Sequence, residues 1–288
     1  MKHLLTTLWA IALLSPLFLT SCSQSDDQLP PDTATTAPDS VTFTISFTPY
    51  EQSPMTKAAT SISDYCTALD VWIYESGSEV SSYHQSSTDD GFGSLSVTLN
   101  VTNTYTLYAV AHRCTSPTTL ADGIISFPDD KLTHSFFFSN TFTPTKGMSM
   151  NCLMNRIVAQ FQFVTSDEVP DWCKTMRFTI YDIYDRWNVT TGGTHSLDRV
   201  STFENFTTKN DGTVTFNIYA IVTSSNTPHD VLVEALNADG DVVEQHLFED
   251  VPLRNSYKTA ATGNFFTDAA ATFSFTAEEW QNNTNYNF

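Results

Sequence analysis

Histidines and neighbouring carboxylates are the residues that could supply acid–base catalysis or bind a metal. Beyond the first 21 residues the histidines are scattered, with no sequence partner at a catalytic or metal-binding spacing (His84, His112, His134, His195, His229 and His246). The pairs Asp89-Asp90, Asp129-Asp130 and Glu278-Glu279 are adjacent, which is typical of solvated turns; catalytic carboxylates come from different strands. No nucleophile elbow, His-Glu-x-x-His helix, Cys-x-x-Cys pair or phosphate-binding glycine loop is present. The sequence therefore predicts no enzyme and no cofactor.

The segment Asn237-Ala238-Asp239-Gly240-Asp241 has a carboxylate spacing that faintly resembles a calcium loop. The downstream glutamate that completes such a loop is missing. Asp-Gly between two alternating stretches is instead typical of a hairpin turn, because these residues tolerate positive φ angles. We expect a hairpin at this segment, and no metal.

Cysteines offer a second kind of chemistry. Cys66, Cys114, Cys152 and Cys173 lack the spacing of a zinc or redox motif. In an exported chain they can be oxidised, and four cysteines allow three pairings. The sequence does not decide whether these four cysteines are structural thiols or form disulfides.

Cys22 follows an N-terminal segment with the features of an export signal. Lys2 precedes an almost wholly apolar run from Leu4 to Leu19, and small residues follow. Leu19-Thr20-Ser21-Cys22 matches the bacterial lipobox, whose cysteine becomes the lipidated first residue after cleavage. We therefore expect residues 1–21 to be a lipoprotein signal peptide. Acyl chains on Cys22 would then anchor the mature protein in the outer membrane.

Residues 22–40 read as an acidic, proline-rich linker without fixed structure. Its first part, Ser23-Gln24-Ser25-Asp26-Asp27, resembles the acidic signal that sends Bacteroidetes lipoproteins to the outer face of the outer membrane. The expected location is therefore the cell surface.

The charge balance excludes one large class of partners. Once Lys2 is removed, 12 basic residues face 32 acidic ones, a formal net charge of −20. A chain this acidic would be repelled by nucleic acid, so we expect no nucleic-acid binding. Its aromatic content of 13% is too high for an acidic disordered protein, and a folded chain with an acidic surface is expected.

Alternation of apolar and polar residues recurs along the chain and no long helical stripe competes with it, which predicts an all-β fold. The predicted strands are 41–47, 68–74, 94–101, 104–112, 134–140, 156–164, 176–184, 213–222, 231–236, 242–248 and 271–277.

The two halves of the chain echo each other. "CTALDVWIY" (66–74) has a counterpart in "CKTMRFTIY" (173–181), and "TYTLYAVA" (104–111) in "TVTFNIYAIV" (213–222). Two tandem β-sandwiches explain such a repeat more easily than one large sheet. We expect an N-terminal sandwich over 41–150 and a C-terminal sandwich over 151–288.

Three stretches together resemble the Bacteroidales fimbrillin-type pilin family. They are the lipobox and linker leading to "PMTKAAT" (54–60), the arginine-containing "LMNRIVAQFQFV" (153–164), and "VPLRNSYKTAATGNFFT" (251–267). The resemblance implies two transthyretin-like Greek-key β-sandwich domains. It also implies a structural subunit of surface fimbriae whose partners are other fimbrial subunits.

The resemblance also implies an assembly mechanism. In polymerising members a protease cuts after a basic residue behind the first strand, and the vacated groove accepts a C-terminal segment of the next subunit. Carried over here, the cut would fall between Lys57 and Ala58, although the family's usual cleavage residue is arginine. The departing strand is expected at the edge of its sheet. It would vacate pockets filled by Val41, Phe43, Ile45 and Phe47, and the candidate donor is 271–288. Without cleavage the protein would serve as a lipidated anchor or accessory subunit.

An alternative interpretation is a surface-exposed glycan-binding lipoprotein, with a host or glycan receptor that the sequence does not identify. It would share the anchor, the linker and the sandwiches. Its sugar-stacking platform would be built from Trp72, Trp172, Trp187 and Trp280.

Overall fold

The computed structural model describes residues 39–50, 61–128, 131–204, 206, 213–222, 227–267 and 273–279. Pro38–Phe288 forms one compact unit. Within the described residues the only helical element is the short 3-10 turn η1 (Ile62–Asp64), and the remaining regular elements are strands. The predicted all-β class is confirmed. The predicted signal peptide, and the predicted linker as far as residue 38, lie outside the described residues.

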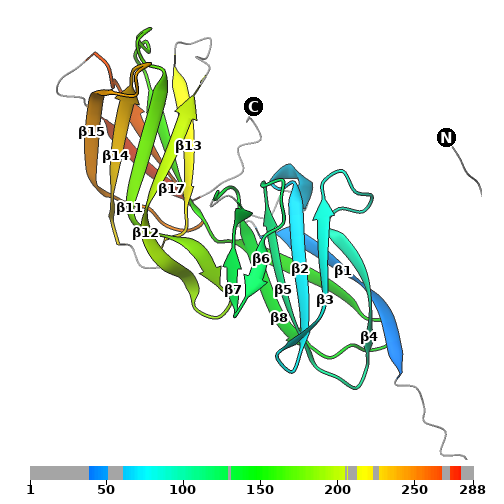
Figure 1. The fold of residues 1–288 in the computed structure, drawn as a ribbon. Helices are drawn as coiled ribbons and strands as arrows, with labels where there is room; N and C mark the ends of the chain where they lie inside the picture. Colours follow the sequence, from blue (N-terminus) through cyan, green and yellow to red (C-terminus); the bar gives the residue numbers. More distant parts are fainter. Residues whose placement is uncertain are drawn as a thin grey trace, which may run out of the picture. The chain divides into compact units, whose positions relative to one another are not determined.

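The first half of the chain forms an N-terminal sandwich of two sheets (Figure 1). Its strands are β1 (Ser40–Pro49), β2 (Ala68–Glu75), β3 (Ser78–Ser86), β4 (Ser94–Asn100), β5 (Tyr105–His112), β8 (Phe136–Phe142) and β9 (Ser149–Arg156). One sheet has the order β9-β1-β4 and the other β3-β2-β5-β8. A short pairing of β8 with β9 connects the two sheets.

The second half forms a C-terminal sandwich. Its strands are β10 (Ala159–Thr165), β11 (Thr175–Asn188), β12 (Gly192–Glu204), β13 (Val214–Ala220), β14 (His229–Leu236), β15 (Val242–Val251), β16 (Tyr257–Gly263) and β17 (Ser274–Glu279). One sheet has the order β13-β10-β16-β17; in the other, β15, β14 and β11 are successive and β12 also pairs with β11. The short β6 (Thr119–Ala121) and β7 (Ile124–Ser126) extend the second sheet through the pairing of β7 with β11.

The strand order repeats between the sandwiches. β1 lies between a parallel partner, β9, and an antiparallel partner, β4; β10 lies in the same way between β16 and β13. β2 and β11 are therefore equivalent, which agrees with the echo between 66–74 and 173–181. The second predicted correspondence, between 104–111 and 213–222, is wrong. β5 of the N-terminal sandwich corresponds to β14 of the C-terminal sandwich, and β4 corresponds to β13.

The sheets also correct the predicted boundary between the halves. β9 spans Ser149–Arg156 and pairs with β1, so a boundary at 150–151 would cut through a strand of the first sandwich. Apart from the short β6 and β7, which join a sheet of the C-terminal sandwich, the strands change from one sandwich to the other between β9 and β10.

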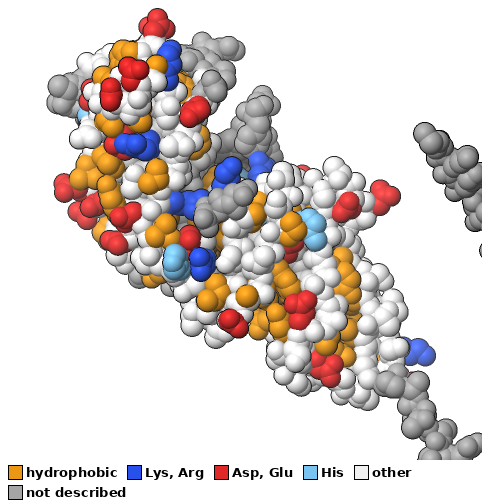
Figure 2. Space-filling view, viewed as in Figure 1, with side chains coloured by type: hydrophobic (Ala, Val, Ile, Leu, Met, Phe, Trp, Pro, Cys, Tyr) orange, Lys and Arg blue, Asp and Glu red, His pale blue; other side chains and the backbone are white. Residues whose placement is uncertain are grey.

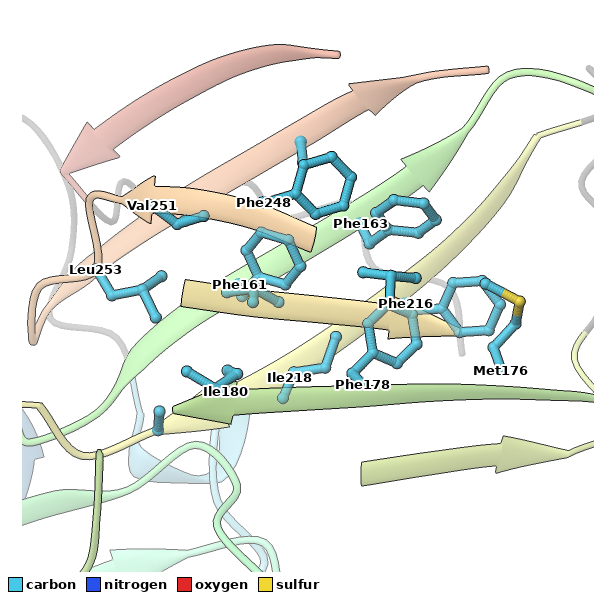
Figure 3. Close-up of a cluster of buried hydrophobic side chains, with 14 of the residues drawn as sticks. Phe161, Phe163, Met176, Phe178, Ile180, Phe216, Ile218, Phe248, Val251 and Leu253 are labelled. Atoms are coloured by element: carbon cyan, nitrogen blue, oxygen red, sulfur yellow. The ribbon is translucent and has the colours of Figure 1, made fainter. Parts of the chain in front are cut away.

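Each sandwich encloses its own apolar core because alternate strand residues point between the two sheets. In the C-terminal core, Phe163 from β10 packs against Phe178 of β11, Phe216 of β13 and Phe248 of β15 (Figure 3). The N-terminal core is built mainly from residues of β1, β2, β4, β5, β8 and β9.

A third cluster connects the two sandwiches. It contains Trp72 and Val110 from β2 and β5, Ile125 from β7, and Ile221 just after β13. Burial of apolar side chains of this size contributes about 1.5–3 kcal/mol each. The two halves therefore share apolar contacts in addition to their covalent link.

The predicted hairpin is present and joins β14 to β15. The Asn237 side-chain oxygen accepts hydrogen bonds from the backbone N–H groups of Asp239 and Asp241, at 2.9 Å each. Only Gly240 of this turn has a positive φ, at 84°, so the expectation of positive φ at both Asp239 and Gly240 is corrected.

Candidate functional site

The strand β1 is an inner strand, not the edge strand that the assembly hypothesis supposed. It forms a seven-pair antiparallel ladder with β4, from Ser40↔Asn100 to Ser46↔Ser94. A six-pair parallel ladder, from Thr44↔Ser149 to Pro49↔Met154, joins it to β9. Removal of β1 would therefore open a slot with backbone hydrogen-bonding groups on both sides. We call this place, between β9 and β4, the β1 slot.

The apolar side chains of β1 fill the floor of the β1 slot. Phe43, Ile45 and Phe47 have exposed fractions of 4%, 0% and 2%, and Val41 packs against the same core from a partly buried position. The Phe43 ring contacts Phe142 edge-on, with centroids 5.9 Å apart. The four side chains named from the sequence thus share one buried face, as alternation predicts.

One end of the slot is closed by η1 and a glycine. The Phe47 N–H donates to the carbonyl oxygen of Gly93 at 2.8 Å. Gly93 has φ +86°, and a Cβ there would lie 2.7 Å from a methyl group of Ile62. Glycine is therefore required at this position by both backbone conformation and space. The chain that leaves β1 passes into residues 51–60, so Lys57 and Ala58 lie outside the described residues, as does Cys22.

The predicted donor segment begins in the C-terminal sandwich. β17 forms a single six-pair ladder with β16, at the edge of its sheet. Phe273, just before it, packs against Phe248 with centroids 4.8 Å apart, while Phe275 is 41% exposed. Residues 280–288 lie outside the described part of the chain. β17 is therefore paired on one side, and the Phe275 side chain is partly in water.

A buried carboxylate fixes the chain ahead of this edge strand. Asp167 accepts hydrogen bonds from the backbone N–H groups of Phe265, Phe266 and Thr267, at 3.0, 2.6 and 2.9 Å. Burial raises its pKa, but hydrogen bonds from the Thr165 hydroxyl and these N–H groups outweigh burial and lower the pKa. The ionised Asp167 therefore holds residues 265–267, which follow β16.

The fold brings together histidines that the sequence left apart. The buried Asp70 carboxylate contacts His84 Nδ1 at 2.6 Å and His112 Nε2 at 2.9 Å, and accepts from the Thr118 hydroxyl at 2.6 Å. The Cys114 N–H donates to His112 Nδ1 at 3.1 Å, so the proton of that ring is on Nε2 and points to Asp70. Burial raises the pKa of Asp70, but the hydrogen bonds from His112, Thr118 and His84 outweigh it and lower the pKa.

This cluster is unsuited to nucleophilic catalysis. The Thr118 hydroxyl donates its proton to the carboxylate, not to an imidazole nitrogen, so no base activates it. Both carboxylate oxygens are occupied by partners within the fold. The pairing could not be found from spacing, because His84 and His112 reach Asp70 from the two strands that flank β2.

A second polar cluster surrounds His134. The Arg156 guanidinium donates to its Nδ1 at 2.7 Å, and its Nε2 lies 2.9 Å from the Tyr219 hydroxyl. Burial, together with the charges of Arg156 and Arg113, lowers the pKa of His134 to about 2. The Arg156 guanidinium also lies over the Phe136 ring, 4.4 Å from its centroid. The arginine in "LMNRIVAQFQFV" is therefore a buried structural cation.

Of the cysteines named from the sequence, Cys66, Cys152 and Cys173 are free thiols in the structure, and the Cys114 thiol donates to the carbonyl oxygen of Lys131 at 3.4 Å. Cys66 and Cys152 lie in the N-terminal core and Cys173 in the C-terminal core. Burial raises the pKa of the Cys66 and Cys152 thiols to about 12 each, which makes them poor nucleophiles. Among the described residues, no group of three His, Cys, Asp or Glu side chains is arranged to hold a metal ion.

The predicted tryptophan platform is not assembled in the described part of the chain. Trp72 is buried, with an exposed fraction of 7%, and Trp187 packs against Phe137 with centroids 5.7 Å apart. Trp172 is 36% exposed and contacts Phe266, while Trp280 lies outside the described residues. The described tryptophans therefore do not share one exposed surface.

One family model and several solved structures match this chain. A model described as "Family of unknown function (DUF6562)" matches residues 125–287. No curated protein matches the chain. None of the described residues forms a helix with the length and apolar character needed to cross a bilayer.

Several solved structures resemble the chain over most of its length. A candidate adhesin from Bacteroides ovatus matches with a TM-score of 0.53, 10% identity, and coverage of 82% of this chain and 96% of that one. A candidate polysaccharide-binding protein from Bacteroides thetaiotaomicron matches with a TM-score of 0.50, 10% identity, and coverage of 85% and 99%. The fimbrial anchor protein Mfa2 from Porphyromonas gingivalis matches with a TM-score of 0.45, 9% identity, and coverage of 83% and 97%.

Proposed function

Because the chain belongs to a family of unknown function (DUF6562), we propose its role from its fold and candidate site. The protein is a structural subunit of bacterial cell-surface fimbriae, either assembled by strand exchange or acting as an anchor or accessory subunit. The observation that carries the proposal is β1, an apolar strand at the start of the described chain that occupies a slot between two other strands. A surface role also agrees with the adhesin description of the Bacteroides ovatus structure.

An empty β1 slot would favour insertion of a strand from a neighbouring subunit. A strand in the β1 slot forms ladders of seven and six residue pairs, whereas β17 forms one ladder of six pairs. A net backbone hydrogen bond contributes about 0.5–1.5 kcal/mol, and a large buried apolar side chain about 1.5–3 kcal/mol. A C-terminal segment that moved from the edge of its own sheet into a neighbour's slot would therefore gain both kinds of contact.

Proteolysis would make this exchange possible. While β1 is covalently attached, it competes for the slot at a very high effective concentration. Cleavage between Lys57 and Ala58 would turn β1 into a separate peptide that can leave. Lipid on Cys22 would hold the subunit at the outer membrane before the cut and would be lost with β1 after it. Uncut copies would remain anchored and could start or end a polymer.

We infer a structural, non-catalytic role because the Asp70 carboxylate is already occupied by His84, His112 and Thr118 within the fold. The surface location and the fimbrial partners belong to the same proposal, as does the absence of nucleic-acid binding.

The experiment is N-terminal sequencing of the protein recovered from sheared surface fibres and from the membrane fraction. Ala58 as the first residue in heat-resistant fibre ladders would support the stalk version, and lipidated Cys22 at the fibre base would support the anchor version. A Lys57→Ala variant should abolish the first species and leave the second. A protein found only as a monomer, without association with fibres, would contradict both versions.

A further inference from the structure

The sheet β9-β1-β4 has an outer face that carries no charged residue. Alternate residues of its three strands point away from the core: Ser40, Thr42, Thr44, Ser46 and Thr48; Ser94, Ser96, Thr98 and Asn100; Ser149, Asn151, Leu153 and Asn155. All are exposed or half-buried. Apart from Leu153, every one is Ser, Thr or Asn. We call this surface the hydroxyl face.

This composition is unusual for the molecule. The chain has 32 acidic residues and a net charge of −19. On the face drawn in Figure 2, acidic side chains stand among uncharged ones, and Lys and Arg are fewer. The outer face of the C-terminal sheet around β11 differs from the hydroxyl face, because it carries the Arg177–Glu234 ion pair at 2.7 Å. The absence of charge on the hydroxyl face is therefore a local property of that sheet.

The groups on the hydroxyl face form a regular array. Thr44 stands opposite Ser96 on β4 and Ser149 on β9, and Ser46 opposite Ser94 and Asn151. Neighbouring strands lie about 4.8 Å apart, and residues on one face of a strand repeat about every 6.7 Å. The Thr42 and Thr98 hydroxyls are 2.7 Å apart, so adjacent hydroxyl groups are close enough to share one ligand hydroxyl. The surface thus offers closely spaced donors and acceptors without charge.

One end of the array is apolar. Leu153 is 52% exposed and Tyr50 46% exposed, and the Tyr50 N–H donates to the carbonyl of Met154, beside Leu153. An aromatic ring next to hydroxyl and amide groups can stack on the apolar face of a pyranose. A second copy of the chain fits less well, because Ser and Thr are under-represented among the residues that dominate protein interfaces.

We propose that the hydroxyl face binds an uncharged polysaccharide, with Tyr50 stacking on one sugar ring. Sugar hydroxyls match the donors and acceptors of Ser, Thr and Asn, and a neutral chain avoids the repulsion that this protein would exert on an acidic one. The site requires β1 in place, so it belongs to the uncut form. It does not rest on the proposed fimbrial role.

The test is native affinity electrophoresis of the chain beginning at Pro38, in gels that contain dextran, mannan, galactan or, as an acidic comparison, polygalacturonate. The first variant, Thr42→Val/Thr44→Val/Thr98→Val, removes three hydroxyls but keeps the β-branched shape, so the strands should be preserved. Thr202→Val, at an exposed strand position on β12, is the matched control. Thermal unfolding of each variant checks the fold.

Retardation by at least one neutral polysaccharide is expected, with about a tenfold weaker apparent affinity in the triple variant and in Tyr50→Ala, because two or three hydrogen bonds or a stacking contact are lost. The control should bind like the unmodified chain. Failure to bind any of the three neutral polymers would overturn the proposal. Equal retardation by polygalacturonate, or binding that survives the triple variant and disappears in Trp172→Ala, would overturn it as well.

Discussion

β1 and β10 occupy equivalent places in the two sandwiches but differ in how the rest of the chain holds them. Each forms seven antiparallel and six parallel residue pairs with its neighbours. β10 is also held by side chains: Gln162 donates to Asn217 at 3.0 Å, and Thr165 donates to the buried Asp167. Among the described residues, β1 has one side-chain hydrogen bond to a neighbouring strand, between the Thr42 and Thr98 hydroxyls.

Backbone pairing alone therefore does not decide which of the two strands can be replaced. β10 follows β9 directly and leads into β11, so it cannot leave without breaking both sandwiches. β1 is the first strand in the described part of the chain, so no described strand precedes it in the sequence. The segment that follows it contains the predicted cleavage site. Strand exchange is therefore proposed for β1 and not for β10.

The largest effect on stability is expected when a phenylalanine is removed from the core that each of the two strands fills. Phe163→Ala should cost about 4–5 kcal/mol of unfolding free energy, because that ring contacts Phe178, Phe216, Phe248, Phe265 and Phe273. Phe43→Ala should cost about 3 kcal/mol, since Phe142 is its ring partner. Urea unfolding of both variants measures the difference. A larger loss for Phe43→Ala would show that β1 is held at least as firmly as β10.

A smaller effect is expected where Asp167 supports the C-terminal sandwich. Asp167→Ala leaves three backbone N–H groups at residues 265–267 without their acceptor, and should cost about 2–3 kcal/mol. Hydrogen exchange should show faster exchange at residues 265–267, with the β1–β4 ladder unchanged. Equal acceleration in both sandwiches would contradict an effect confined to this loop.

The pH dependence should reflect His134, near the contact of the two halves. Its pKa of about 2 in the folded protein is below the ordinary value of about 6.5, so folding favours the neutral ring. The contribution of the neutral His134 ring to the free energy of unfolding is complete above pH 6.5. Below that pH the contribution is lost, by at most about 1.4 kcal/mol per pH unit, as the unfolded state takes up a proton.

Unfolding free energies measured between pH 7 and pH 5 for the unmodified chain and for His134→Gln would test this. Gln keeps a hydrogen-bonding amide but does not titrate, so part of the slope should disappear. Parallel curves for the two proteins would mean that His134 does not titrate differently in the folded and unfolded states.

The smallest effect on stability is expected at the exposed end of the donor segment. Phe275→Ala should cost less than about 1 kcal/mol, because the side chain is 41% exposed and contacts Phe248 at the edge of the core. The same change should strongly reduce fibre formation, because this side chain would fill a pocket of a neighbour's slot. Normal fibres from this variant would argue against 271–288 as the donor.

The sequence predicted strands well where β-branched and aromatic residues alternate, as in β1, β2, β5 and β13. It missed β3, β9, β12 and β16, which contain many Ser, Asn, Gly or Ala residues and owe their conformation to pairing with stronger neighbours. It also missed β6 and β7, which have only three residues each. The missed β9 has the largest consequence, because β9 pairs with β1 and makes it an inner strand, whereas the sequence predicts an edge strand.

The candidate site was predictable only in part. Alternation in 41–47 was enough to place Phe43, Ile45 and Phe47 on one buried face. Contacts such as Asp70 with His84 and His112 join different strands, so no spacing in the sequence encodes them. The hydroxyl face likewise appears only when the register of three strands is known.

The most direct measurement of the central claim uses a chain that begins at Ala58, refolded with and without a synthetic peptide of residues 271–288. We expect this chain, lacking β1, to bind the peptide in a one-to-one ratio and to regain the thermal stability of the chain that begins at Pro38. A peptide of the same composition in scrambled order should not restore it. If the Ala58 chain is fully stable alone, or ignores the native peptide, the β1 slot is not an assembly site.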